Sequence, residues 1–240
     1  GSVVRVIESA DGSNYRITQV PSVQASFVSM DPTDGAIHAL IGGFDFGLSK
    51  FNHITQGYRQ PGSTIKPFIY SAAMEKNRMN PNSVVDDKPI KIGSWQPKNA
   101  DGRYLGPIPL STALASSRNM VSIRLLQSIG NDYFRSYAER FGFEGKRIDK
   151  YLTVALGAIE ATPYQIVGAY GVFANGGYKV DPYFIKKVVD RSGTVILEAK
   201  PRLANDEKNR VITKENAAMT DALLKGVVRG GTARAASALG

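Results

Sequence analysis

The sequence predicts a mixed α/β fold (of the α+β type), in which an antiparallel sheet packs against helices. At three places, alternating apolar residues flank a turn signal, which is typical of β-hairpins. Between them, apolar residues recur every three or four positions, which indicates helices with one buried face. The chain has 240 residues, of which 42% are hydrophobic and 21% charged. Such a chain can bury a sizeable core.

A domain boundary is predicted between the first and second of the three hairpins. They pair residues 3–7 with 15–20, 25–30 with 36–41, and 184–190 with 194–198. Pro21 interrupts the strand pattern between the first two, so we place a domain boundary near Ser22. Residues 1–22 are then a linker or the end of a small accessory β-region, and residues 23–240 form the main domain.

The predicted helices follow the second hairpin. The first begins after the break at Pro61-Gly62 and runs to about Lys76. Asn80–Pro109 contains five prolines and no helical period, which predicts a long surface loop. Further helices are expected over 110–115, 119–129, 131–141 (capped by Asn131), 163–174 (capped by Thr162), and from Thr213 to about 230.

Composition excludes several classes of function. The chain has no cysteine, which excludes disulfides, thiol nucleophiles and thiolate metal sites. His38 and His53 lie outside any metal-binding spacing, so we expect no metal and no cofactor. The formal net charge is +9, but the basic residues are spread along the chain, so nucleic acid is not the expected partner. No run of about 18 apolar residues predicts a membrane span.

The chemistry centres on Ser63 and Lys66, in Arg59-Gln-Pro-Gly-Ser-Thr-Ile-Lys-Pro-Phe68. Positions three apart share one face of a helix, so the hydroxyl and the amine should be neighbours. A neutral, buried lysine can deprotonate a serine nucleophile, provided that its pKa falls several units below about 10.4. The apolar residues Ile65, Phe68 and Ile69 can provide that burial.

Ser116-Ser-Arg-Asn119 is the second chemical element, at the start of a predicted helix. Taken alone, it is typical of a helix cap. Beside the Ser63–Lys66 pair, Ser117 offers a hydroxyl that can relay protons, and Asn119 offers an amide that can bind a carbonyl or orient the lysine.

With both motifs, the chain resembles the transpeptidase domain of class A (bifunctional) penicillin-binding proteins, in the penicilloyl-serine-transferase superfamily. The resemblance covers roughly Val23 to Gly240. The matching stretches are Arg59–Phe68, Trp95–Asn99 with Tyr104 and Gly106, Ala113–Asn119, Leu156–Pro163 and Phe173–Gly177.

The resemblance implies a peptidoglycan D,D-transpeptidase that cross-links stem peptides through a serine acyl-enzyme and is inhibited by β-lactams. It makes Ser63 the nucleophile, Lys66 its base, Ser117 the proton relay and Asn119 the group that holds the donor amide. Thr64, Trp95 and Tyr104 are expected at the substrate cleft, although Trp95 and Tyr104 are equally suited to anchor a loop. The expected location is the periplasm, with a membrane anchor in the full-length protein only.

Three alternatives remain open within this fold. One is a scaffold module without turnover, and the others are a D,D-carboxypeptidase and a β-lactamase-like hydrolase. A β-lactamase would need a deacylating glutamate in a Glu-x-x-Leu-Asn setting, and neither Glu139 nor Glu160 stands in one.

The family's third motif, Lys-Thr-Gly or Lys-Ser-Gly, does not occur in the sequence. In the family it follows the stretch matched by Gly230–Ala236, on a strand that supplies the second oxyanion N–H. The predicted sheet would keep only the hairpin of residues 25–41, and two strands alone are marginal in water. We therefore expect a second polypeptide, carrying that strand, to accompany this chain after a cut near Gly240.

Overall fold

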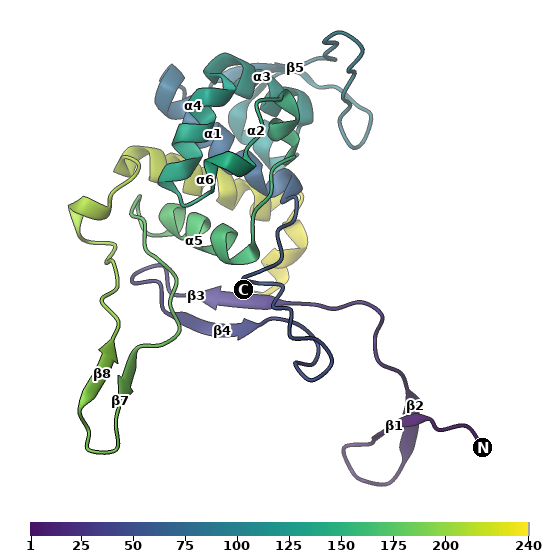
Figure 1. The fold of residues 1–240 in the computed structure, drawn as a ribbon. Helices are drawn as coiled ribbons and strands as arrows, with labels where there is room; N and C mark the ends of the chain where they lie inside the picture. Colours follow the sequence, from purple (N-terminus) through teal and green to yellow (C-terminus); the bar gives the residue numbers. More distant parts are fainter. Residues whose placement is uncertain (240) are drawn as a thin grey trace.

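The computed structural model describes residues 1–239 and shows a helical body with short hairpins around it (Figure 1). The mixed α/β class predicted from the sequence is confirmed. Helix α1 is central to the body and makes contacts with α2, α3, α4 and α6. The α-helices are α1 (Lys66–Asn77), α2 (Leu110–Ala115), α3 (Asn119–Ile129), α4 (Asn131–Arg140), α5 (Pro163–Ala174) and α6 (Lys214–Gly230).

Helix α1 is buried along its first nine residues, from Lys66 to Met74. Its Phe68 ring packs against four other aromatic rings, with centroids 5.0–5.3 Å away. These rings come from α5 and from the end of α4 and the turn after it, so the cluster fixes α1 between them. The partner rings are Phe141, Phe143, Tyr170 and Phe173.

A buried polar cluster ties α1 to α4 and α6. The Ser71 hydroxyl donates to the Asn216 side-chain oxygen at 2.7 Å and lies 2.7 Å from the Tyr137 hydroxyl. The Asn216 amide returns a hydrogen bond of 3.0 Å to the Ser71 carbonyl. Because buried polar groups are costly when unpaired, these reciprocal bonds fix how the three helices align.

The strands of residues 1–239 form four two-stranded antiparallel sheets. All three predicted hairpins are present, with shorter strands than expected. The sheet β3–β4 lies under α5, and the outer edge of β4 meets the backbone of Tyr183. The pairs are β1 (Arg5–Glu8) with β2 (Tyr15–Thr18), β3 (Phe27–Met30) with β4 (Ile37–Ile41), β5 (Val84–Asp87) with β6 (Gly106–Pro109), and β7 (Lys187–Val189) with β8 (Val195–Glu198).

Two local predictions were wrong. The expected loop Asn80–Pro109 contains the pair β5–β6; its prolines fit because β6 is an edge strand that needs no N–H there. Asn131 does not cap α4, since Gly130 occupies the cap position. The caps predicted at Thr162 and Thr213 are confirmed, each accepting a hydrogen bond from the backbone three residues on.

Short 3₁₀ helices were not predicted, and one of them positions the site. They are η1 (Gly62–Ile65), η2 (Gly145–Arg147), η3 (Leu152–Leu156), η4 (Glu207–Asn209) and η5 (Arg234–Leu239). Their lack of a 3.6-residue apolar period explains why the sequence pattern missed them.

The hairpin β1–β2 stands apart from the helical body in Figure 1, and its residues are almost all exposed. The domain boundary near Ser22 stays a prediction. None of the helices in residues 1–239 is long and apolar enough to cross a membrane. The expected cut near Gly240 lies outside the described residues.

Candidate active site

Ser63 lies in η1, the tight turn that leads directly into α1. Pro61 precedes the turn, and Gly62 opens it with a φ of +57°, a value that favours glycine. As the second residue of a helical turn, Ser63 has a backbone N–H without an intrahelical acceptor. Pro67 fits in the first turn of α1, where a missing backbone N–H leaves no hydrogen bond unmade.

Gly157 packs closely against the backbone of this turn. Its φ is +86°, and a Cβ atom built on it would overlap the backbone of Gly62. Glycine is therefore the residue that lets the turn after η3 approach the Ser63 turn.

Lys66 is the first residue of α1 and is only 1% exposed. Its Nζ donates to the Ser117 carbonyl at 2.7 Å, to the Ser117 Oγ at 2.9 Å and to the Asn119 Oδ1 at 2.7 Å. The structure thus brings together Lys66, Ser117 and Asn119, as the sequence predicted. The neighbouring apolar residues Ile65, Phe68 and Ile69 are fully buried as well.

The three acceptors around Lys66 match the three protons of an ammonium group. A neutral amine has only two protons and a lone pair, so one contact must change when Lys66 loses its charge. The Ser117 carbonyl and the Asn119 Oδ1 can only accept, whereas the Ser117 hydroxyl can also donate. Deprotonation of Lys66 is therefore coupled to reorientation of the Ser117 hydroxyl.

Burial is the main cause that lowers the pKa of Lys66, to about 8. The positive charge of Arg118 lowers this pKa further, and the negative charge of Asp87 raises it. At neutral pH, Lys66 is then uncharged in a fraction of the molecules on the order of one tenth.

Ser117 lies before α3 in the left-handed conformation, with a φ of +51°. Its side chain does not cap α3: the cap position belongs to Arg118, whose own side chain makes no capping hydrogen bond. The first N–H of the helix, that of Asn119, donates instead to the Asn99 Oδ1 at 2.8 Å. The helix-cap interpretation of Ser116–Asn119 is therefore wrong, and Ser117 and Asn119 serve Lys66 instead.

Ser63, Ser117 and Asn119 line one cleft, with a volume of about 660 Å³. The end of α6 closes one side of the cleft through Gly230, Gly231 and Thr232. The Thr232 N–H donates to the Ala115 carbonyl at 3.0 Å, which fixes this side next to the Ser117 segment. The other wall is Asn99, Ala100, Asp101, Arg103 and Leu105.

The three residues expected at the substrate cleft are absent from its lining. Trp95 and Tyr104 are half-buried and pack against the hydrophobic core, which fits the loop-anchor interpretation. Thr64 donates from its hydroxyl to the Pro61 carbonyl at 2.8 Å and lines an apolar groove beside β3 and α5. Contact of these residues with substrate stays a prediction.

Sequence reasoning gave no role to Asp87 or to Asn99. Asn99 belongs to a stretch that resembles the family, Trp95–Asn99, so that resemblance was the available signal. Asp87 lies in the segment predicted as a loop and is fully buried. No local pattern marks it.

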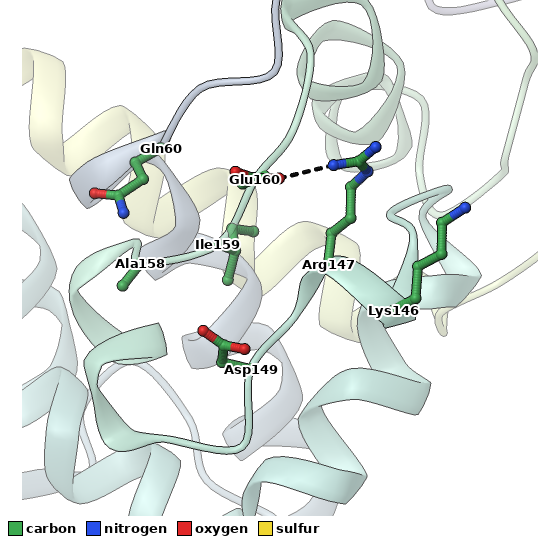
Figure 2. Close-up of a pocket in the computed structure, with 7 residues that line it drawn as sticks. All are labelled: Gln60, Lys146, Arg147, Asp149, Ala158, Ile159 and Glu160. Atoms are coloured by element: carbon green, nitrogen blue, oxygen red, sulfur yellow. Dashed lines mark hydrogen bonds and ion pairs between the residues drawn. The ribbon is translucent and has the colours of Figure 1, made fainter.

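A second hollow, of about 550 Å³, is lined in part by Gln60, which comes three residues before Ser63 (Figure 2). Its Arg147 is paired with Glu160 at 2.7 Å, and the guanidinium stacks on the Tyr58 ring at 3.7 Å. Ser63 and Lys66 do not line it, so these charges brace the segment before the turn. Among residues 1–239, no group of three acidic or histidine side chains could hold a metal ion.

The sequence model of a protein family, the penicillin-binding protein transpeptidase domain, matches residues 25–239, nearly the whole chain. The chain belongs to the penicillin-binding protein transpeptidase family. Penicillin-binding proteins 1A are similar to it in sequence: that of Neisseria flavescens is 45% identical over the full length of this chain, and that of Pseudomonas aeruginosa is 46% identical over 84% of it.

A crystal structure of penicillin-binding protein 1A from Haemophilus influenzae has the same fold. It matches 95% of this chain with a TM-score of 0.86 and 35% identity. A transpeptidase domain from Eggerthella lenta, 21% identical, shares the fold with a TM-score of 0.76. The chain covers 31% of the Neisseria flavescens protein and 38% of the Haemophilus influenzae chain.

Proposed function

We propose that this penicillin-binding domain is a serine D,D-transpeptidase that joins peptidoglycan stem peptides and is acylated by β-lactams at Ser63. One observation carries the proposal: a buried lysine, held by Ser117 and Asn119, lies three residues after a serine that opens onto a cleft. The family of the chain supports the same reaction class.

In the first half-reaction, the Ser63 oxygen attacks the penultimate D-alanine carbonyl. Neutral Lys66 takes the Ser63 proton, and Ser117 passes a proton to the departing amine of the terminal D-alanine. The carbon–nitrogen bond breaks, and an ester to Ser63 forms. The Ser63 N–H stabilises the oxyanion of the tetrahedral intermediate, and Asn119 holds the donor's amide.

In the second half-reaction, an amine from another stem peptide attacks the ester. Lys66 or Ser117 takes its proton, a new amide forms, and the Ser63 oxygen recovers a proton. In residues 1–239, no glutamate lines the cleft, and its one acidic residue, Asp101, is engaged by Arg118 at 2.9 Å. The cleft therefore offers no free carboxylate to activate water, which favours transfer over β-lactam hydrolysis.

A fluorescent penicillin tests this function on the full-length protein. Wild type should gain one label that resists denaturation, and peptide mapping should place it on Ser63. Ser63→Ala should fold and remain unlabelled. No labelling of either protein would support the scaffold alternative, and equal labelling of wild type and Ser63→Ala would place the nucleophile at another residue. Rapid loss of the label with release of penicilloic acid would support the hydrolase.

We also propose that a strand carrying a Lys-Thr-Gly triplet pairs with β3 and completes the oxyanion site. The triplet does not occur in the 240 residues, and within residues 1–239 strand β3 pairs with β4 alone. Strand β3 therefore has an edge to which another strand can bind. Intact mass and denaturing gels of the folded protein would test this. Covalent penicillin binding by this chain alone would show the idea to be wrong.

For the protein that contains this chain, we propose a periplasmic location with a membrane anchor outside these residues. Its partners would then be donor and acceptor stem peptides.

A further inference from the structure

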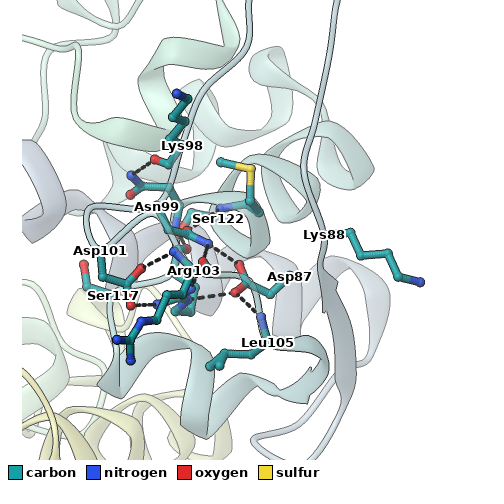
Figure 3. Close-up of polar contacts among 12 residues, drawn as sticks. Asp87, Lys88, Lys98, Asn99, Asp101, Arg103, Leu105, Ser117 and Ser122 are labelled. Atoms are coloured by element: carbon teal, nitrogen blue, oxygen red, sulfur yellow. Dashed lines mark hydrogen bonds and ion pairs between the residues drawn. The ribbon is translucent and has the colours of Figure 1, made fainter.

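A buried ion pair joins Arg118, in the lining of the cleft, to Asp87 of β5. Figure 3 shows Asp87 among the polar contacts around it. The Arg118 Nε donates to the Asp87 Oδ2 at 2.8 Å, and the two side chains are only 5% and 0% exposed. The Arg118 Nη1 donates to Asp101 at 2.9 Å, and its Nη2 donates to the Arg103 carbonyl. Every nitrogen of this guanidinium therefore has an acceptor, which holds it in one orientation.

Asp87 uses its second oxygen to hold another residue of the wall. Its Oδ1 accepts a hydrogen bond of 2.9 Å from the Asn99 amide, and the Asn99 Oδ1 accepts one of 2.8 Å from the Asn119 N–H. The triplet Ser117–Asn119 is thus held from one carboxylate in two ways, directly at Arg118 and through Asn99 at Asn119.

The triplet needs such support because Ser117 is in a costly conformation. In a left-handed backbone, the Cβ of a residue other than glycine lies too close to a carbonyl oxygen, so this conformation is strained. In this conformation the Ser117 carbonyl and hydroxyl both reach Lys66. A change in the orientation of Arg118 would be transmitted directly to these contacts, because the two residues share a peptide bond.

We propose that Asp87, Asn99 and Arg118 are positioning residues, which hold Ser117 and Asn119 against Lys66. The inference rests on the proposed function of Ser63 and Lys66. None of the three residues is assigned contact with substrate; they act through the triplet and through their charges.

The ion pair also acts on Lys66 electrostatically, in two opposite senses. The Arg118 charge lowers the pKa of Lys66 and the Asp87 charge raises it. The turn η1 and the first helical turn of α1 contribute no other charged side chain. The other charged residues in the segments around the cleft are Lys98, Asp101, Arg103, Arg229 and Arg234.

Opposite charge effects make the inference testable. The second-order rate of acylation by benzylpenicillin would be measured from pH 6 to pH 10 on the full-length protein, together with thermal unfolding. Asp87→Asn should move the rise of the rate to lower pH, and Arg118→Gln should move it to higher pH. Both should lower the rate at the plateau about 10- to 100-fold, as expected for misplaced catalytic groups.

A third variant separates position from charge. Arg118→Lys keeps the positive charge but loses the planar fork, so it should lower the plateau without moving the pH of the rise. Asp86→Asn is the matched control, because it removes a negative charge from the residue of β5 that precedes Asp87. The Asp86 carboxylate pairs with the exposed Lys88 at 2.9 Å. It should resemble wild type.

Two results would overturn the inference. One is an Asp87→Asn profile that coincides with that of wild type. The other is a common shift of Asp87→Asn and Arg118→Gln in one direction, in proportion to lost thermal stability. Should Asp87→Asn fail to fold, Asp101→Asn weakens the same guanidinium from its exposed end, and an unchanged plateau there would count against the inference. A different result would contradict the proposed function itself, namely penicillin labelling that survives Ser63→Ala.

Discussion

At the scale of single residues, Lys66 combines burial with three hydrogen bonds, and a larger cation cannot repeat both. Arginine stays protonated at any accessible pH, so it cannot act as a base. We expect Lys66→Arg to fold but to lose penicillin acylation by at least about 100-fold. Labelling kinetics and a thermal melt would measure both. Lys225→Arg, on the exposed face of α6, is the control, and acylation of Lys66→Arg at the wild-type rate would place the base elsewhere.

The lowered pKa of Lys66 also predicts the pH dependence of wild type. In the proposed mechanism the active form is the neutral amine, so the acylation rate should rise as pH increases and level off above a pKa of about 8. The direction follows from burial, which favours loss of the proton. Stopped-flow acylation by benzylpenicillin across this range would show it. A rate that is flat from pH 6 to pH 9 would mean that a different group accepts the proton.

At the scale of elements, the turn η1 depends on how closely η3 and its following glycine approach it. We expect Gly157→Ala to displace the Ser63 turn, because the added Cβ would overlap the Gly62 backbone. Gly176→Ala is a matched control, since its φ of +87° is nearly the same as the +86° of Gly157 but nothing lies within 4 Å of the new Cβ.

Both glycine variants should lose roughly 1 kcal/mol of stability to backbone strain. Only Gly157→Ala should lose substantially more and also lower the acylation rate. Urea unfolding and labelling kinetics of the two proteins give the comparison. Equal behaviour of the pair would show that the contact between Gly157 and Gly62 has no influence on the site.

Elements with a strong local signal could be predicted from the sequence. The caps at Thr162 and Thr213 and the three hairpin turns follow from residue chemistry within a few positions. The pair β5–β6 could not be predicted, because its strands lie about twenty residues apart and one of them contains two prolines. Its pairing depends on contacts with the rest of the domain.

The site was predictable in part for the same reason. Ser63 and Lys66 are neighbours along the chain, and the resemblance added Ser117 and Asn119. Asp87 was missed because only its partner shows that this carboxylate is buried in an ion pair. That partner, Arg118, lies 31 positions further along the chain. No periodicity links the two.

At the scale of the whole molecule, the polar cluster of Ser71, Tyr137 and Asn216 connects three helices far apart in sequence. Ser71→Ala would remove a buried hydroxyl and leave its partners short of a hydrogen bond. We expect a loss of about 1–3 kcal/mol in the free energy of unfolding. Ser128→Ala makes the same change on the exposed side of α3 and should cost no more than about 0.5 kcal/mol. Chemical denaturation measures both, and equal losses would contradict the role given to the cluster.

That cluster also has a consequence for the timescale of motion near Ser63. Helices α1, α4 and α6 should open only as one unit, so their amide hydrogens should exchange with solvent slowly and together. The exposed hairpins β1–β2 and β7–β8 should exchange much faster. Lys66 belongs to the slow unit, whereas Ser63 lies in the short turn at its border. In the proposed reaction, the base would then lie in a rigid helix, and the nucleophile in the turn at its border.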